Sequence, residues 1–515
     1  MNRMMLCLVL LMLAGVFAGA ETPVYPEKST VEGDRIEEFF NRVPELQHDR
    51  ADRWPMIMWE GISLEPQPVE VYEKLLKRGL TQHVRMDPDM IPVALTLQEA
   101  GSPVIMMQGK GGEWPYRLAG DPDQWAHVYE EGYEPESERR GKACLPVLTA
   151  WELAARRVRQ TLREFRDAGV TVDAVWMDWE GEPLGSSRGY ENARHCTRCQ
   201  KLLPPEVLAS RADYRDYCWR LYLELVGTYL SAPAREIFPG VSTTNWMAVY
   251  STIERPARGA WWEDELPPSV PPMLTATNPV GYGNTNYYRW EWKDSYPLDR
   301  EHVDQFYSHI LLRQVSDNAA NRMKFAPQVD SFPWVIRWCP DTLDPSIPIL
   351  SRARYREMLR HIWLRGADGM QIFNASRKGY DELVFNEVVD AVRVYDEMLV
   401  YREFLDDGRV MNTDVPPLQD QGVIWSGLRL EDRALLRIFR PDGAPAEITL
   451  SPWEDAEVTV DELEVSEGIF HVLKRTDDGI VIERESEEPE EPRPEAEPPE
   501  AEGTEDREET GEAQD

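Results

Sequence analysis

The sequence has little positive charge. Its 515 residues include 56 Lys and Arg against 92 Asp and Glu, and the formal net charge is −36. Proteins that bind nucleic acid or anionic membranes usually present a basic patch or groove, and no stretch of this sequence supplies one. We therefore expect no nucleic-acid partner, and the charge also disfavours a strongly polyanionic substrate.

Long apolar runs are also scarce. The exception is Met1–Ala20, which has Arg3, an apolar core and the small residues Ala18-Gly19-Ala20. This is the pattern of a secretory signal peptide, with cleavage predicted after Ala20. No other stretch approaches the roughly 20 apolar residues that a membrane helix needs. The sequence predicts a secreted or periplasmic protein with no membrane span.

Cysteine is rare. Beyond Cys7 in the apolar leader, the chain has Cys144, Cys196, Cys199, Cys218 and Cys339. In an oxidising compartment one or two disulfides are the default, with one thiol left over. The Cys196-x-x-Cys199 spacing, next to His195, also suits zinc, but a second Cys-x-x-Cys is absent. A disulfide is the favoured interpretation, so we assign no metal and no cofactor.

Short apolar segments alternate with amphipathic helical segments along most of the chain. The predicted strands are Trp54–Gly61, Leu80–Met86, Pro103–Gln108, the stretch Val172–Pro183, Val241–Val249, Met273–Asn278, Lys324–Val329 and Gly369–Phe373. Eight strand–helix pairs are typical of a (β/α)8 TIM barrel, which we place at 54–407. An open doubly wound sheet is the competing fold, but the first strand lacks a Gly-rich phosphate turn.

The two ends of the chain have other patterns. Residues 21–53 form a polar N-terminal leader after the signal peptide at 1–20. From Gly408 to residue 482, apolar alternation with turn residues predicts a small antiparallel β-domain, whose expected role is structural. Residues 483–515 are rich in Glu and Pro and predict a disordered acidic tail.

Two acids stand out at the end of the fourth predicted strand. The sequence VDAVWMDWEGEP begins as an apolar run and ends in Asp178 and Glu180. Alternate residues of a strand share a face, so these carboxylates are expected about 7 Å apart and pointing the same way. In a barrel the functional groups gather at the carboxyl ends of the strands. Asp178 and Glu180 are therefore our candidate catalytic residues.

The other predicted strand ends supply acids, amides and aromatic rings. The candidate substrate-binding residues are Trp59, Glu60, Arg85, Gln108, Asn245, Trp246, Tyr282, Tyr287, Gln328 and Asn374. Aromatic faces stack on the C–H surfaces of sugars, and carboxylates and amides bind hydroxyl groups. This mixture favours a carbohydrate ligand.

The fourth strand resembles a known motif. Asp173, Asp178 and Glu180 match the first Asp, the last Asp and the Glu of the DxxDxDxE motif of chitinases, whereas Trp176 stands where that motif has its second Asp. The Asp-Trp-Glu triplet also resembles the hyaluronidases, although their Trp-Arg-Pro continuation is absent. The resemblance covers about ten residues and the order of the barrel elements, and it implies a barrel glycoside hydrolase.

The resemblance implies that Glu180 is the general acid and that Asp178 orients a substrate 2-acetamido group. Two close carboxylates share charge poorly, so one pKa rises and that group donates a proton near neutral pH. A second mechanism stays open. Glu180 would be the acid/base of a retaining enzyme, and Asp330, at the end of the seventh predicted strand, would be the nucleophile.

The sequence thus predicts a secreted glycoside hydrolase that cleaves a polysaccharide or glycan without a cofactor. Two alternatives remain at this point. One is a barrel that binds glycans without catalysis. The other is a zinc-dependent hydrolase that uses His195, Cys196, Cys199 and one further ligand.

Overall fold

A computed structural model describes residues 35–59, 62, 65–108, 126–135, 144, 146–177, 187–245, 274–281, 303–325, 327–338, 349–374, 380–417, 422–441, 446–462 and 468–485. The predicted signal peptide and nearly all of the predicted acidic tail lie outside these residues. Within the described residues, no helix combines the length and the apolar character that crossing a membrane requires.

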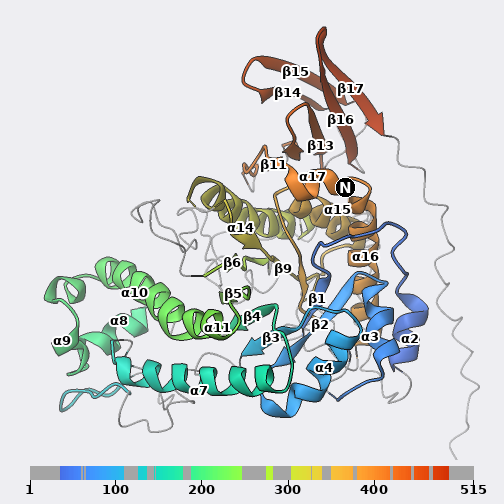
Figure 1. Cartoon of the computed structure of the whole chain (residues 1–515). Helices are drawn as coiled ribbons and strands as arrows, with labels where there is room; N and C mark the ends of the chain where they lie inside the picture. Colours follow the sequence, from blue (N-terminus) through green and yellow to red (C-terminus); the bar gives the residue numbers. More distant parts are fainter. Residues whose placement is uncertain are drawn as a thin grey trace, which may run out of the picture.

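A curled parallel sheet occupies the centre of the molecule (Figure 1). Its strand order is β5-β4-β3-β2-β1-β10-β9-β7. The strands are β1 (Met56–Met58), β2 (Leu80–Arg85), β3 (Ile105–Gln108), β4 (Ala174–Met177), β5 (Ser242–Asn245), β7 (Val280–Gly281), β9 (Trp334–Val335) and β10 (Gln371–Ile372). A further parallel pair joins β6 (Ala276–Thr277) to β8 (Asp330–Ser331). The backbone N–H of Thr275 donates to Thr243 on β5 at 2.9 Å, which links this pair to the edge of the sheet.

Helices lie between successive strands and cover the outside of the sheet (Figure 1). They are α2 (Arg35–Arg42), α3 (Val69–Leu76), α4 (Ile91–Glu99), α7 (Leu148–Asp167), α8 (Ser187–Arg194), α9 (Cys199–Leu202), α10 (Arg211–Val226), α11 (Ala232–Ile237), α14 (Val303–Phe325), α15 (Arg352–Trp363), α16 (Asp381–Leu399) and α17 (Arg402–Asp407). Helix α7 shows why they pack there. Its apolar residues recur at helical spacing, and Trp151, Leu162 and Phe165 are buried. Each such side chain contributes roughly 1.5–3 kcal/mol.

The two faces of the sheet belong to different apolar clusters. On β4, Val175 and Met177 join the core between sheet and helices. Ala174 and Trp176 instead join a cluster that also contains Ile57 and other strand residues. Because side chains of a strand alternate between its faces, the second cluster marks the inside of the curl. Even-numbered residues of β4 therefore point inward.

The C-terminal part forms antiparallel sheets (Figure 1). One has the order β11-β12-β13-β16-β17, and β14 pairs with β15. The strands are β11 (Arg409–Val410), β12 (Ile424–Arg429), β13 (Arg433–Phe439), β14 (Ala446–Trp453), β15 (Ala456–Glu462), β16 (Ile469–Thr476) and β17 (Gly479–Glu485). The sequence prediction of a mixed α/β fold with a parallel sheet and separate antiparallel sheets is thus confirmed.

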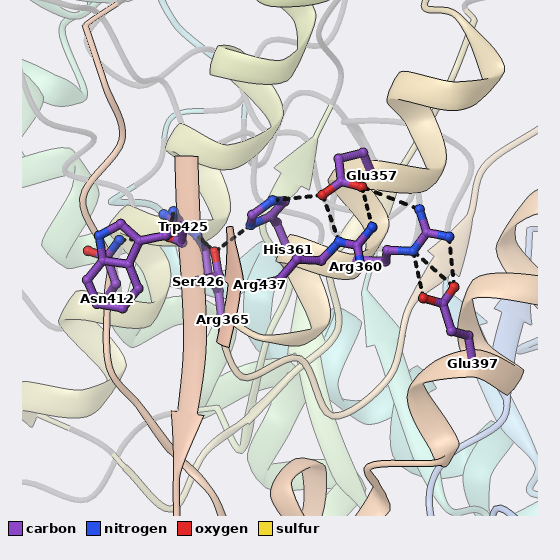
Figure 2. Close-up of polar contacts among 9 residues, drawn as sticks. All are labelled: Glu357, Arg360, His361, Arg365, Glu397, Asn412, Trp425, Ser426 and Arg437. Atoms are coloured by element: carbon purple, nitrogen blue, oxygen red, sulfur yellow. Dashed lines mark hydrogen bonds and ion pairs between the residues drawn. The ribbon is translucent and has the colours of Figure 1, made fainter. Parts of the chain in front are cut away.

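A buried polar network holds the antiparallel sheet to the helical layer (Figure 2). Arg437 of β13 donates to both carboxylate oxygens of Glu357 on α15, at 2.8 and 2.7 Å. Ser426 of β12 lies 2.9 Å from His361 Nδ1 and accepts from Arg365 at 2.9 Å. The two layers therefore share charged groups that neither could bury alone.

Two segments differ from the sequence prediction. The seventh strand, predicted at Lys324–Val329, is wrong because α14 continues to Phe325 and β8 begins only at Asp330. A short apolar run does not distinguish a helix end from a strand, and Pro333, which lacks an N–H, interrupts the strand that follows. The polar leader also contains a helix, α2, whose Phe39 is buried against Phe385.

Candidate active site

Aromatic rings gather inside the curl where the parallel strands end. Trp59 directly follows β1 and Phe373 directly follows β10, and their rings stack at 5.8 Å with an interplanar angle of 26°. The ring of Trp334 on β9 lies 4.9 Å from Trp59. Trp334 is fully buried, whereas Trp59 and Phe373 are only half-buried. The carboxyl end of the sheet thus presents two partly exposed aromatic faces above a buried aromatic layer.

A single amide joins the side chains of that buried layer. Gln371 of β10 is fully buried. In the amide orientation that its neighbours require, its oxygen accepts from the indole N–H of Trp334 at 3.0 Å, from that of Trp176 at 3.2 Å and from the amide of Asn278 at 2.6 Å, and its nitrogen donates to His83 Nε2 at 3.1 Å. Burial lowers the pKa of His83 to about 3, so the imidazole is neutral and accepts this hydrogen bond. The network fixes four strands against one another beneath Trp59.

Several predicted site residues lie at this end of the sheet. Trp59 is there, and Arg85 ends β2 with its guanidinium partly exposed, 3.9 Å from Asp89. Asn245 ends β5 but is fully buried. The backbone of Gln108 ends β3. The remaining candidates lie outside the described residues: Glu60, Asp178, Glu180, Trp246, Tyr282 and Tyr287.

The position predicted for Asp330 is wrong. Asp330 is the first residue of β8 and pairs in register with Ala276, the first residue of β6. All of these strands are parallel, so Asp330 lies at the amino end of the sheet. Gln328 precedes it there in an exposed turn. Burial raises the pKa of Asp330 to about 6, and the neighbouring Asp368 acts in the same direction.

Asn374 also has a different role from the one predicted. It is fully buried, and its amide nitrogen donates to the Trp338 carbonyl at 2.6 Å and to Glu387 at 3.1 Å. The Glu387 carboxylate accepts in addition from the backbone N–H of Arg337 at 2.8 Å. Asn374 therefore closes a buried network between β10 and α16, and its side chain is not accessible to a substrate.

Asp173, the first residue of the chitinase-like motif, is structural too. Its carboxylate accepts from the backbone N–H of Val104 at 2.8 Å, just before β3 and β4 begin. It lines a groove of about 440 Å³ at the amino end of the sheet, together with Arg53 and Trp54. This end lies opposite Trp59 and Phe373.

Sequence reasoning missed the polar residues inside the curl. It considered strand ends, whereas His83 and Trp176 lie within strands. One signal was present: Thr81, His83 and Arg85 place a polar side chain at every second position of a buried strand. A buried strand with polar side chains along one face indicates that the inside of the curled sheet is polar.

A second cluster lies away from the curl. The ligating atoms of His127, Cys144, Cys196 and Cys199 all lie within 4.8 Å of one another. The three cysteines are buried and His127 is half-buried. His195, which the sequence placed beside the Cys-x-x-Cys spacing, is not in this group and instead pairs with Glu130. The sequence analysis assigned no metal, and it did not connect His127 or Cys144 with this site.

Comparisons with protein-family models and with curated proteins found no match. Similar solved structures include a variant of GH36 alpha-galactosidase AgaA from Geobacillus stearothermophilus, with a TM-score of 0.43 and 12% identity over 88% of this chain and 58% of that chain. A maltogenic alpha-amylase, AmyB from Thermotoga neapolitana, has a TM-score of 0.40 and 11% identity over 83% of this chain and 96% of that chain. Alpha-L-fucosidase isoenzyme 2 from Paenibacillus thiaminolyticus has a TM-score of 0.39 and 11% identity over 74% of this chain.

The chain spans only 48% of the fucosidase and 58% of the alpha-galactosidase. These neighbours are glycoside hydrolases. At such identities and TM-scores, the similarity assigns no family to this chain.

Proposed function

We propose that the protein is an exported (β/α)8-barrel glycoside hydrolase in which Glu180 is the general acid and Asp178 its partner. The observation that carries the proposal is the alternation of β4, where Ala174 and Trp176 point into the curl while Val175 and Met177 point outward. Asp178 and Glu180 lie outside the described residues, and the strand period of the sequence predicts that they share the face of Ala174 and Trp176.

The hydrogen bonding at the sheet edges supports a closed barrel. The link from Thr275 to Thr243 and the parallel pair β6–β8 continue from β5, and β10 pairs with β1 at the other side. In such a barrel the acids that follow β4 share one mouth with Trp59 and Phe373.

The chemistry of this mouth suits a sugar. Trp59 and Phe373 offer half-exposed faces for stacking on a pyranose ring. In an acid pair, the charge of one carboxylate raises the pKa of the other, which then protonates the leaving glycosidic oxygen. Since Asp330 lies at the opposite end of its strand, we favour the substrate-assisted form, in which a 2-acetamido group attacks the anomeric carbon.

A panel of N-acetylated and neutral polysaccharides, incubated with purified protein, tests the proposal. We expect Glu180→Gln and Asp178→Asn each to lose about 10²–10⁴-fold in turnover while retaining binding. Glu152→Gln, an exposed acid on α7, is the matched control and should keep full activity. Full turnover by Glu180→Gln would end the proposal.

The same panel distinguishes an enzyme from a barrel that binds glycans without catalysis. The wild-type form of such a binding protein would bind a glycan but release no product. Export is tested independently. N-terminal sequencing of protein recovered from the secreted fraction is expected to begin at Glu21, and an intact Met1 would contradict the predicted cleavage.

A further inference from the structure

Four potential metal ligands converge from three separate segments of the chain. His127 comes from 126–135, Cys144 stands before α7, Cys196 lies between α8 and α9, and Cys199 is the first residue of α9. The first two follow β3 and the last two follow β4. Helices α8 and α9 lie at the edge of the molecule, far from the antiparallel sheets (Figure 1).

The distances suit one tetrahedral ion. Zinc–sulfur bonds of 2.3 Å at tetrahedral angles place two sulfurs about 3.8 Å apart. The Sγ atom of Cys144 lies 3.9 Å from Cys196 Sγ and 3.1 Å from Cys199 Sγ, and Cys199 Sγ lies 3.7 Å from His127 Nδ1. A disulfide requires sulfurs about 2.05 Å apart, and these three cysteines are unpaired. A disulfide would also join only two of them, whereas one ion uses all four groups.

Hydrogen bonds and a ring contact position the ligands independently of any ion. Tyr129 and Cys196 form an antiparallel bridge, and the N–H of Thr197 donates to the Val128 carbonyl at 2.8 Å. Arg198, between the two cysteines, donates to the Ala126 carbonyl at 2.8 Å. The imidazole of His127 stacks on the ring of Tyr129 at 5.8 Å. The site is therefore held by its own hydrogen bonds, as a specific metal site requires.

His195, which is adjacent to Cys196 in the sequence, contacts other side chains. The ring of His195 stacks on Tyr133 at 4.1 Å with an interplanar angle of 12°, and its Nδ1 pairs with Glu130. Tyr133 in turn donates to Asn192 at 3.3 Å. The structure thus selects His127, which is remote in sequence, over His195, which is adjacent to Cys196.

We propose that His127, Cys144, Cys196 and Cys199 bind a structural zinc ion that staples the segment after β3 to the segment after β4. Three sulfurs and one imidazole fill a tetrahedral shell, and structural zinc sites are closed in this way, whereas catalytic ones keep a position for water. On binding, each of the three thiols releases its proton to solvent, and Zn²⁺ with three thiolates carries a net charge of −1. The staple lies on the side of the sheet from which Asp178 and Glu180 follow β4.

Metal analysis of the full chain, purified from zinc-containing medium without chelators, tests the proposal. We expect one zinc per chain, and X-ray absorption at the zinc edge should fit three sulfurs near about 2.3 Å and one nitrogen near about 2.0–2.1 Å. Replacement by Co²⁺ should give the visible bands of tetrahedral thiolate coordination. Protein without bound metal, or a mapped disulfide among these cysteines, would overturn the proposal.

Two matched pairs of variants test the ligand assignment. His127→Ala should weaken zinc binding by at least about tenfold, whereas His195→Ala should keep it. Cys199→Ser should lose zinc, whereas Cys218→Ser should retain it, because Cys218 is a buried cysteine of α10 outside the cluster. Loss of zinc from His195→Ala with retention by His127→Ala would contradict the assignment. If a ligand variant fails to fold, the zinc-edge spectrum of the wild-type chain still decides the ligand set.

Discussion

Removing one charge from the buried Arg437–Glu357 pair is expected to destabilise the protein strongly. The pair joins β13 to α15 (Figure 2), and its side chains are 0% and 4% exposed. Burial by itself raises the pKa of Glu357, but Arg437 and His361 outweigh that effect and hold the pKa well below its usual range. The carboxylate is therefore charged at neutral pH and depends on its partners.

Arg437→Met replaces the guanidinium by an apolar side chain of similar length. Glu357 would keep Arg360 Nη1 at 3.4 Å, but Arg360 is already engaged with Glu397 at 2.8 Å. His361, whose pKa burial lowers to about 4, is neutral at pH 7 and does not replace the lost charge. Leaving one buried charge without its partner costs about 3–5 kcal/mol. We expect Arg437→Met and Glu357→Leu each to lower the free energy of unfolding by about this amount.

The double variant Glu357→Leu/Arg437→Met removes both charges. We expect it to be more stable than either single variant, because neither charge is left buried alone. Urea unfolding at pH 7, followed by tryptophan fluorescence and far-UV circular dichroism, measures all four proteins. Since the pair connects two layers, a second transition in the single variants would show that the antiparallel sheets unfold separately.

The pH dependence gives a further check. A lowered pKa in the folded state stabilises the protein above the unfolded pKa of about 4.3, and this contribution is lost as the pH falls below it. The difference in free energy of unfolding between the wild-type protein and Arg437→Met should therefore become smaller at acid pH. Two results would refute this expectation. One is a free energy of unfolding of Arg437→Met that lies within about 1 kcal/mol of the wild-type value at pH 7. The other is a loss in the double variant equal to the sum of the two single losses.

Further expectations concern other sites. Asp330→Asn should stabilise the protein above pH 6 by up to about 3 kcal/mol and have no effect below pH 4, because burial raises the folded pKa of Asp330 to about 6 against about 3.9 unfolded; urea unfolding at the two pH values measures this. The same variant should retain glycosidase activity, and its inactivity would restore the nucleophile hypothesis. Trp59→Ala should weaken oligosaccharide binding by about tenfold in titration calorimetry, and Trp59→Phe should preserve most of it. Removal of zinc with a chelator should lower the melting temperature of the wild-type protein. Cys199→Ser should have the lower melting temperature without chelator, and the chelator should not change it further. The Cys218 thiol, whose pKa burial raises to about 12, should stay unreactive toward thiol reagents in the native protein.

The sequence determined the class of fold through local periodicity. Short apolar runs separated by amphipathic helices such as α7 predicted parallel strands covered by helices, and the later alternation predicted antiparallel sheets. Strand period also fixed which β4 residues share a face, and Ala174 and Trp176 do lie on one side. These features depend on neighbours within a few residues, so the sequence contains them in full.

Only the tertiary structure decided which distant residues meet. The Gln371 network joins β10 to His83 and Trp176, and no local pattern links those positions. Because α14 extends to Phe325, the seventh strand begins only at Asp330, and Asp330 therefore lies at the amino end of the sheet. Likewise, the metal ligands Cys144 and Cys199 are 55 positions apart. Contacts of this kind depend on how long connections fold back over the sheet, and residue spacing does not encode that path.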